Sequence, residues 1–169
     1  TMGADLSFIH TTFASIVIDP FLLPETGARI RKENRTVQLG LETGSPRLLG
    51  RLMRGKCRPF DPDEWPRVVV EGCRLLEASG FFAYVSIILG LPGETEEDRK
   101  ATDELIGEIA DFPLCVVPIL FSPSFGSPLW EGEPCSSTGA WSKYQEILRS
   151  VRRVNRGKLP QEMEGIIGF

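Results

Sequence analysis

Val37-Gln-Leu-Gly-Leu-Glu-Thr-Gly-Ser-Pro46 and Ser86-Ile-Ile-Leu-Gly-Leu-Pro-Gly-Glu-Thr95 are the stretches that decide the fold of this chain. Each predicts a short apolar strand that enters a glycine-containing turn and then a capped helix. A strand, a turn and a helix in that order form half of a βαβ unit, and parallel sheets carry ligands where strand becomes helix. Each turn also sets a carboxylate, Glu42 or Glu94, beside backbone N–H groups. The two turns are therefore predicted to form two walls of one small-molecule site.

Helix signals separate the predicted strands along the rest of the chain. From residue 36 onward the expected order is strand, two helices, strand, helix, strand, loop and helix. Because crossovers of that length join parallel strands, we predict an α/β fold with about three parallel strands and flanking helices. The predicted strands cover 36–41, 82–89 and 114–121, and the last helix is marked by an apolar stripe from Trp141 to Val154.

The residues before position 36 are predicted to lead into this sheet. The apolar run Phe13–Ile18 suits a short buried strand or a helix, and its length does not decide between them. Asp19-Pro20 and Pro24 indicate the start of a short helix that runs through Ala28–Lys32.

Alternation along the strands separates two faces of the predicted sheet. Gly40, Ser86 and Gly90 are small or polar positions on one face, which suits a ligand cavity. The opposite face is apolar and is expected to meet the helices at Val37, Leu39, Val85, Ile87 and Leu89.

Composition narrows the classes of function. The 169 residues are 41% hydrophobic and 25% charged, as in an ordinary globular domain. A net charge of −4 and a pI near 5.2 argue against a nucleic-acid partner, and no apolar run reaches the ~20 residues of a membrane span. The four cysteines have no metal-like spacing, and a single histidine leaves little for zinc or for histidine-based catalysis. We therefore expect reduced thiols, a cytoplasmic location and no metal ligands.

Two other interpretations of the glutamate-containing turns remain open at this point. Both turns could be purely structural, with glutamates that only complement the following helix dipoles, as in a non-catalytic α/β interaction module. The glutamate pair also fits an acid–base hydrolase, which would require a raised pKa on one carboxyl.

Two motifs carry a resemblance to a known family. Gly40-Leu-Glu-Thr-Gly-Ser-Pro-Arg-Leu-Leu49, followed about forty residues later by Ser86-Ile-Ile-Leu-Gly-Leu-Pro-Gly-Glu-Thr-Glu-Glu-Asp98, resembles the later half of a radical S-adenosylmethionine (radical SAM) core. The closest likeness is to the branch with an upstream cobalamin-binding domain. Ser122-Pro-Ser-Phe-Gly-Ser-Pro-Leu-Trp-Glu131 is similar to the loop after the sixth strand of that family.

The resemblance implies half of a (β/α)₆ TIM-like barrel, with this chain supplying strands four to six. It divides the chain into a lead-in (1–35), a partial radical SAM-like barrel (36–131) and a C-terminal helix and tail (132–169). In the family the turn after strand four reaches the ribose of SAM, strand five packs on the adenine, and strand six offers backbone to the adenine edge. The matching positions are Glu42 and Ser45, then Ile88, Gly90, Gly93 and Glu94, and finally Leu120 and Ser122.

The chain departs from the family at the iron–sulfur cluster motif, and it also lacks the strand-two segment that grips the methionine amino group of SAM. Radical SAM enzymes hold a [4Fe–4S] cluster with a C-x₃-C-x₂-C motif, and this sequence has none. The resemblance therefore implies a fragment that binds the nucleoside of SAM, while the cluster belongs to the missing N-terminal half of the intact enzyme. An open sheet edge would follow from the missing half, so we expect the chain to self-associate.

Overall fold

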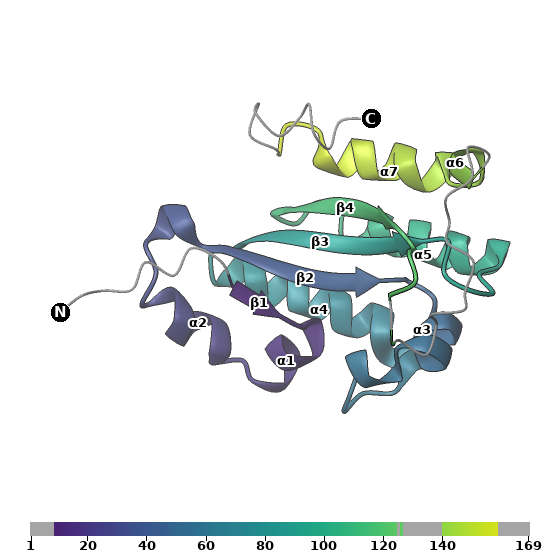
Figure 1. Cartoon of the computed structure of the whole chain (residues 1–169). Coiled ribbons are helices and arrows are strands. Elements are labelled where there is room, and N and C mark those ends of the chain that lie inside the picture. Colours follow the sequence, from purple (N-terminus) through teal and green to yellow (C-terminus); the bar gives the residue numbers. More distant parts are fainter. Residues whose placement is uncertain (1–8, 125, 127–139, 159–169) are drawn as a thin grey trace.

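The sheet contains four parallel strands in the order β1-β2-β3-β4 (Figure 1). The structure is a computed structural model that describes residues 9–124, 126 and 140–158. This arrangement confirms the predicted α/β class and the parallel connections. The strands are β1 (Ile9–Thr11), β2 (Thr36–Glu42), β3 (Phe82–Leu89) and β4 (Leu114–Leu120).

The predicted count of about three strands omitted β1. This strand pairs with β2 over only three residues, from Ile9 opposite Val37 to Thr11 opposite Leu39. Three residues are too few to show an alternating pattern, so the sequence carried no signal for it.

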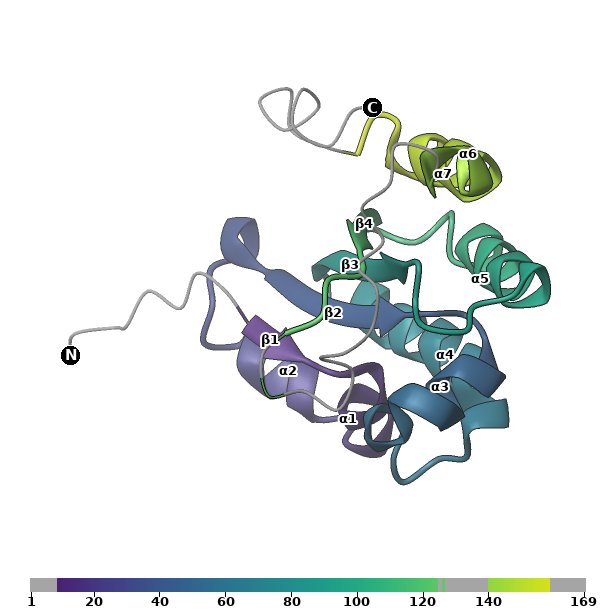
Figure 2. The same ribbon diagram turned by 45° about the vertical axis from the view of Figure 1, so that its right-hand side comes forward.

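The described helices gather on one face of the sheet and along its edges (Figure 2). The α-helices are α1 (Phe13–Ile18), α2 (Leu22–Gly27), α3 (Pro46–Leu52), α4 (Trp65–Ala78), α5 (Glu96–Glu108), α6 (Ala140–Lys143) and α7 (Gln145–Asn155). Short 3₁₀ turns form at η1 (Lys32–Asn34), η2 (Arg54–Lys56) and η3 (Pro62–Glu64).

The N-terminal segment settles one open question and corrects one prediction. Phe13–Ile18 is a helix, because Thr12 caps it by accepting a hydrogen bond from the Ser15 N–H. The next helix, α2, ends at Gly27 and does not run through Ala28–Lys32 as expected. The Gly27 carbonyl accepts a hydrogen bond from the Arg35 guanidinium at 2.7 Å, which draws that last turn toward the start of β2.

The core lies between the sheet and its helices. Alternate residues of β2 and β3 are buried, as the two-face pattern predicted: Val37, Leu39, Leu41, Ala83, Val85, Ile87 and Leu89. Helix α4 packs against these residues and buries its own apolar stripe, from Trp65 to Leu76. The Trp65 ring meets Phe13 of α1 edge to face, with ring centroids 6.1 Å apart. This core fixes the ends of β2 and β3, from which the turns of interest emerge.

The free edge of β4 is covered by α7. The Asn155 side chain accepts a hydrogen bond from the Val116 N–H and donates one to the Val116 carbonyl, both at 2.8 Å. A neighbouring strand would make the same bonds, so the Asn155 amide takes the place of a strand and satisfies the backbone N–H and carbonyl of Val116. At its other edge the sheet ends with β1, which pairs only with β2 among the described strands.

Within the residues described, no helix is both long enough and apolar enough to cross a bilayer.

Candidate functional site

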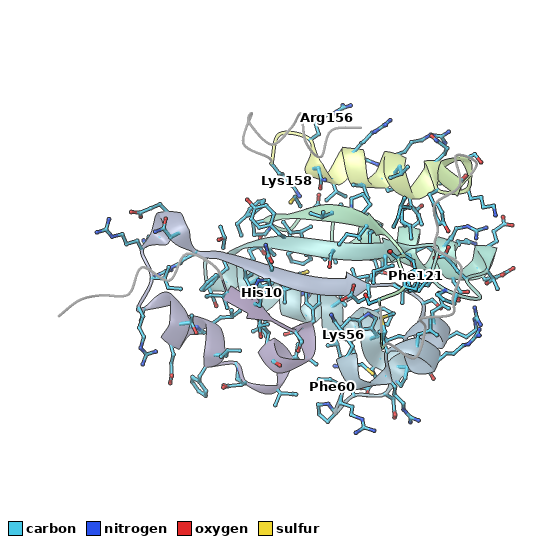
Figure 3. All side chains as sticks on the ribbon, viewed as in Figure 1. His10, Lys56, Phe60, Phe121, Arg156 and Lys158 are labelled. Atoms are coloured by element: carbon cyan, nitrogen blue, oxygen red, sulfur yellow. The ribbon has the colours of Figure 1, made fainter. Side chains whose placement is uncertain are left out.

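A hollow of about 400 Å³ opens on the sheet face that carries the small and polar positions. Its lining comes from all four strands and from η2, so residues far apart in sequence meet there. Figure 3 labels two of the lining residues, His10 and Lys56. The side chains and backbone that line it belong to His10, Thr11, Gln38, Leu39, Gly40, Glu42, Lys56, Tyr84, Ser86, Val117 and Ile119. Of the eight predicted site residues, only Glu42 lines this hollow.

Glu42 has an unusual backbone conformation. Its φ is +64°, in the left-handed region that favours glycine, and it is the one described non-glycine residue with a positive φ. The Thr43 N–H donates to the Leu41 carbonyl at 2.8 Å, which makes Glu42 the centre of a γ-turn. The register between β2 and β3 also shifts between Gly40 and Glu42. Bulges of this kind redirect a side chain, and strained backbone concentrates at functional sites.

The Glu42 carboxylate forms an ion pair with Lys56 of η2. Both side chains are largely buried, with exposed fractions of 14% for Glu42 and 24% for Lys56. A Cβ atom at Gly40 would collide with the Glu42 carboxylate and the Lys56 ammonium, so this glycine provides the space for the pair. Lys56 was not among the predicted site residues, because it follows Glu42 by 14 residues and no local periodicity links them.

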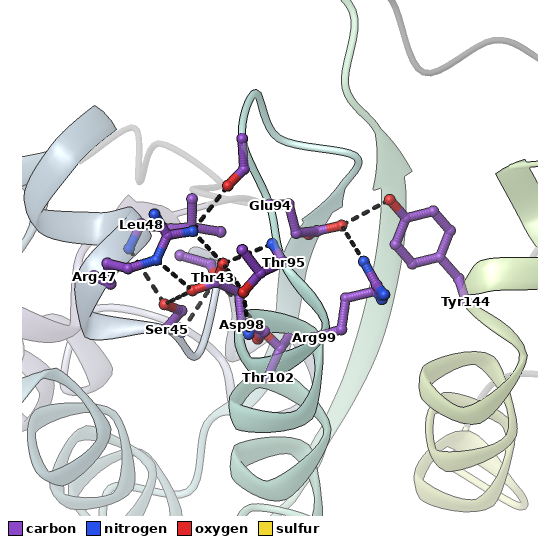
Figure 4. Close-up of polar contacts among 11 residues, drawn as sticks. Thr43, Ser45, Arg47, Leu48, Glu94, Thr95, Asp98, Arg99, Thr102 and Tyr144 are labelled. Atoms are coloured by element: carbon purple, nitrogen blue, oxygen red, sulfur yellow. Dashed lines mark hydrogen bonds and ion pairs between the residues drawn. The ribbon is translucent and has the colours of Figure 1, made fainter.

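Glu94 faces a different environment from Glu42. Its carboxylate accepts a hydrogen bond from the Tyr144 hydroxyl at 2.7 Å and lies 3.9 Å from the Arg99 guanidinium (Figure 4). Burial raises the pKa of Glu94, and the contacts with Tyr144 and Arg99 counter that rise in part. Glu94 therefore holds the segment before α7 against the start of α5 and does not line the hollow that contains Glu42.

Ser45 and Asp98 connect the two turns. The Ser45 hydroxyl accepts from the Leu48 N–H at the start of α3 and donates to the buried Asp98 carboxylate. Asp98 also accepts from Arg47 and from Thr95, the N-cap of α5 (Figure 4). Burial opposes ionisation of Asp98, but these hydrogen bonds outweigh it and hold the pKa of that carboxyl well below its usual range. The two turns therefore lie side by side, joined by a buried polar network.

The remaining predicted residues follow the ends of β3 and β4. Gly90 and Gly93 have φ values of +82° and +72°, so the turn between β3 and α5 requires glycine at both positions. Ile88 packs against Leu48, Leu91 and Phe121 in a small apolar cluster. Leu120 packs against the main core, and Ser122 is exposed just after β4.

The described cysteines Cys57, Cys73 and Cys115 are free and buried, and none of them lines the hollow. The Cys57 thiol donates to the Arg54 carbonyl, while burial raises the pKa of Cys73 to about 12 and that of Cys115 to about 11. Over residues 9–124, 126 and 140–158, no three His, Cys, Asp or Glu side chains gather as a metal site.

Two comparisons with known proteins bear on the family. The family model described as the Radical SAM superfamily matches residues 6–106, more than half of the chain. The chain is also 30% identical over 118 residues to the tRNA-2-methylthio-N(6)-dimethylallyladenosine synthase of Opitutus terrae. That alignment covers 69% of this chain and 23% of the relative, so the chain spans about a quarter of that protein's length. The family match covers β1, β2 and β3 together with both turns. This chain belongs to the radical SAM superfamily.

Proposed function

We propose that this chain forms one wall of the SAM site of a radical SAM enzyme. The observation that carries the proposal is the γ-turn at Glu42, which holds a carboxylate beside Lys56 in the hollow of the sheet. Strained backbone that directs a charged side chain into a cavity has no evident structural purpose here, and it suits a ligand contact.

The chemistry of Glu42 and Lys56 fits the polar groups of SAM. The ribose of SAM carries two neighbouring hydroxyl donors, which a carboxylate can accept together. The methionine part carries a carboxylate, which suits the ammonium of Lys56. We assign the ribose to Glu42 and the methionine carboxylate to Lys56, so that the ligand would replace their contact with each other.

The end of β3 suits the adenine. Ile88 offers apolar surface, and Gly90 and Gly93 let backbone approach a flat ring closely. Backbone at Leu120 and Ser122 would meet the edge of the ring. We assign supporting roles to Ser45 and Glu94, because neither side chain lines the hollow and both already have protein partners.

The radical chemistry belongs to the intact enzyme in this proposal. A [4Fe–4S] cluster held by residues outside this chain would reduce SAM, and the missing half of the barrel is the partner that this chain requires. Whether a cobalamin-binding domain precedes that half stays a prediction from the resemblance.

The hydrolase hypothesis meets one of its requirements and lacks the other. The pKa of Glu94 is raised, as a general acid would need. However, its carboxylate contacts Tyr144 and Arg99 while Glu42 contacts Lys56, so the two glutamates do not share a site. The non-catalytic module is the stronger alternative, because the structural roles of Glu94 and Ser45 need no ligand.

Calorimetric titration of SAM into the chain separates these hypotheses. The wild-type half site should bind SAM weakly, and Glu42→Gln should weaken it about tenfold, as expected for the loss of hydrogen bonds to a charged acceptor. Gly40→Ala should have a similar effect, because the added Cβ displaces Glu42 and Lys56. Glu104→Gln is the matched control, since this α5 side chain is 63% exposed and lies outside the hollow. Absence of heat at millimolar SAM, or equal binding by all variants, would favour the non-catalytic module.

A further inference from the structure

The bend that follows Glu42, residues 43–45, packs directly against helix α5. A Cβ atom added at Gly44 would lie 2.6 Å from the Ala101 carbonyl oxygen and 2.6 Å from Thr102 Cα. Gly44 is therefore required for this close approach, and the bend is packed against the second turn of α5.

The hydroxyl of Thr102 is the centre of the contact. It donates to the Asp98 carbonyl at 2.9 Å, so its oxygen is left to accept. That oxygen accepts from the Gly44 N–H at 3.0 Å and lies 3.3 Å from the Thr43 hydroxyl. All of these contacts are buried.

The hydrogen-bond donors and acceptors of the bend form one continuous network. Since the Thr102 proton is used on Asp98, the Thr43 hydroxyl is the donor to Thr102. The Thr43 oxygen then accepts from the Ser45 N–H at 3.1 Å, and the Thr43 carbonyl accepts from the Trp65 indole at 3.1 Å. The polar groups of the bend are thereby fixed from two sides, by α4 and by α5.

This arrangement explains how Glu42 keeps a positive φ. A left-handed conformation at a residue with a side chain costs free energy and persists only where the surroundings determine it. The residue next to Glu42 is Thr43, and its side chain, carbonyl and N–H are all committed. Removing the Thr102 hydroxyl would leave the Gly44 N–H and the Thr43 hydroxyl without their buried acceptor, which would release the bend.

We propose that Thr102 is a positioning residue, whose hydroxyl fixes the 43–45 bend and thereby holds the Glu42 carboxylate in the hollow. Thr102 itself does not line the hollow, so it acts through the backbone. The consequence for ligand binding rests on the proposed function, whereas the control of the bend does not.

The test compares Thr102→Val, which removes only the hydroxyl, with Thr102→Ser, which keeps it. Thr26→Val is the matched control, because Thr26 makes the same helix bond, from its hydroxyl to the Leu22 carbonyl at 2.6 Å, on α2. Two quantities are measured: hydrogen exchange of the Thr43 amide by NMR, and SAM affinity by calorimetry. Should Thr102→Val fail to fold, Thr102→Ala replaces it, since the smaller side chain leaves room for water.

Thr102→Val should speed exchange of the Thr43 amide about tenfold relative to the amides in the middle of β2, and weaken SAM about three- to tenfold. Thr102→Ser should restore both within about twofold, and Thr26→Val should change neither. Unchanged Thr43 exchange in Thr102→Val, or a serine variant as impaired as the valine variant, overturns the proposal. If wild type does not bind SAM, the proposed function fails, but the exchange data still decide the role of Thr102.

Discussion

Asp98→Ala should destabilise the fold by an amount that can be worked out from its contacts. The carboxylate is buried, with 4% of the side chain exposed, and it accepts from the Ser45 hydroxyl and from the Thr95 N–H at 2.8 Å. Losing the capping bond at the start of α5 costs about 1 kcal/mol. Leaving the buried Ser45 hydroxyl without its acceptor costs about 2 kcal/mol. Arg47 is half exposed and can return to water, so its ion pair adds little.

The expected loss is therefore about 3 kcal/mol, which for a chain of this size corresponds to a fall in Tm of about 6–12 °C. Thermal unfolding at pH 7, followed by circular dichroism, measures it. Asp63→Ala is the matched control, because Asp63 is exposed and should change Tm by no more than a degree or two.

The pH dependence gives a second check on the same residue. Because the folded pKa of Asp98 is lowered, its stabilisation is present above the unfolded value of about 3.9 and is lost as the pH falls toward the folded value. The difference in Tm between wild type and Asp98→Ala should thus be constant above about pH 5 and should narrow on acidification. A difference under about 2 °C at pH 7, or one that widens in acid, would refute the reasoning.

Three further predictions concern the edges of the sheet and the segment before α7. Asn155→Ala leaves the Val116 N–H and carbonyl without partners at the edge of β4, so Tm should fall and association should rise in light scattering; no change would mean that α7 does not protect this edge. Tyr144→Phe removes a donor to ionised Glu94, so the pKa of Glu94 should rise further. A group with a raised pKa stabilises the fold most at low pH and loses that contribution as the pH rises through its folded value. The Tyr144→Phe substitution should therefore lower Tm more at pH 7 than at pH 4. An equal fall in Tm at both pH values would contradict this expectation. The wild-type chain should associate with itself as its concentration increases, and a monodisperse monomer without exposed apolar surface would count against an open half barrel.

Local sequence patterns predicted the elements whose signals lie within a few residues. Strand β3 is a nearly continuous apolar run, and α5 begins at a capping box formed by Thr95 and Asp98, so both were expected where they occur. Thr12 decided the conformation of Phe13–Ile18, but a hydroxyl before an apolar run is compatible with either structure until its hydrogen bond is seen.

Contacts between distant segments could not be predicted in the same way. The pairing of Glu42 with Lys56 depends on where η2 returns after α3, and the pairing of Glu94 with Tyr144 joins residues 50 positions apart. The sequence predicted that two glutamates would stand at neighbouring turns. It could not predict that one carboxylate would point into the hollow and the other toward Tyr144, because the direction of each is set by a partner that arrives later in the chain.

The most direct test of the central claim is the NMR spectrum of ¹⁵N-labelled chain during titration with SAM. The account predicts chemical-shift changes that concentrate at the lining of the hollow, at Gly40, Glu42, Lys56 and Ser86, and at Gly90 beyond it, with little change along the exposed side of α7. Shifts confined to α5 and α7, or no shifts at millimolar SAM, would contradict the claim that this chain supplies a wall of the SAM site.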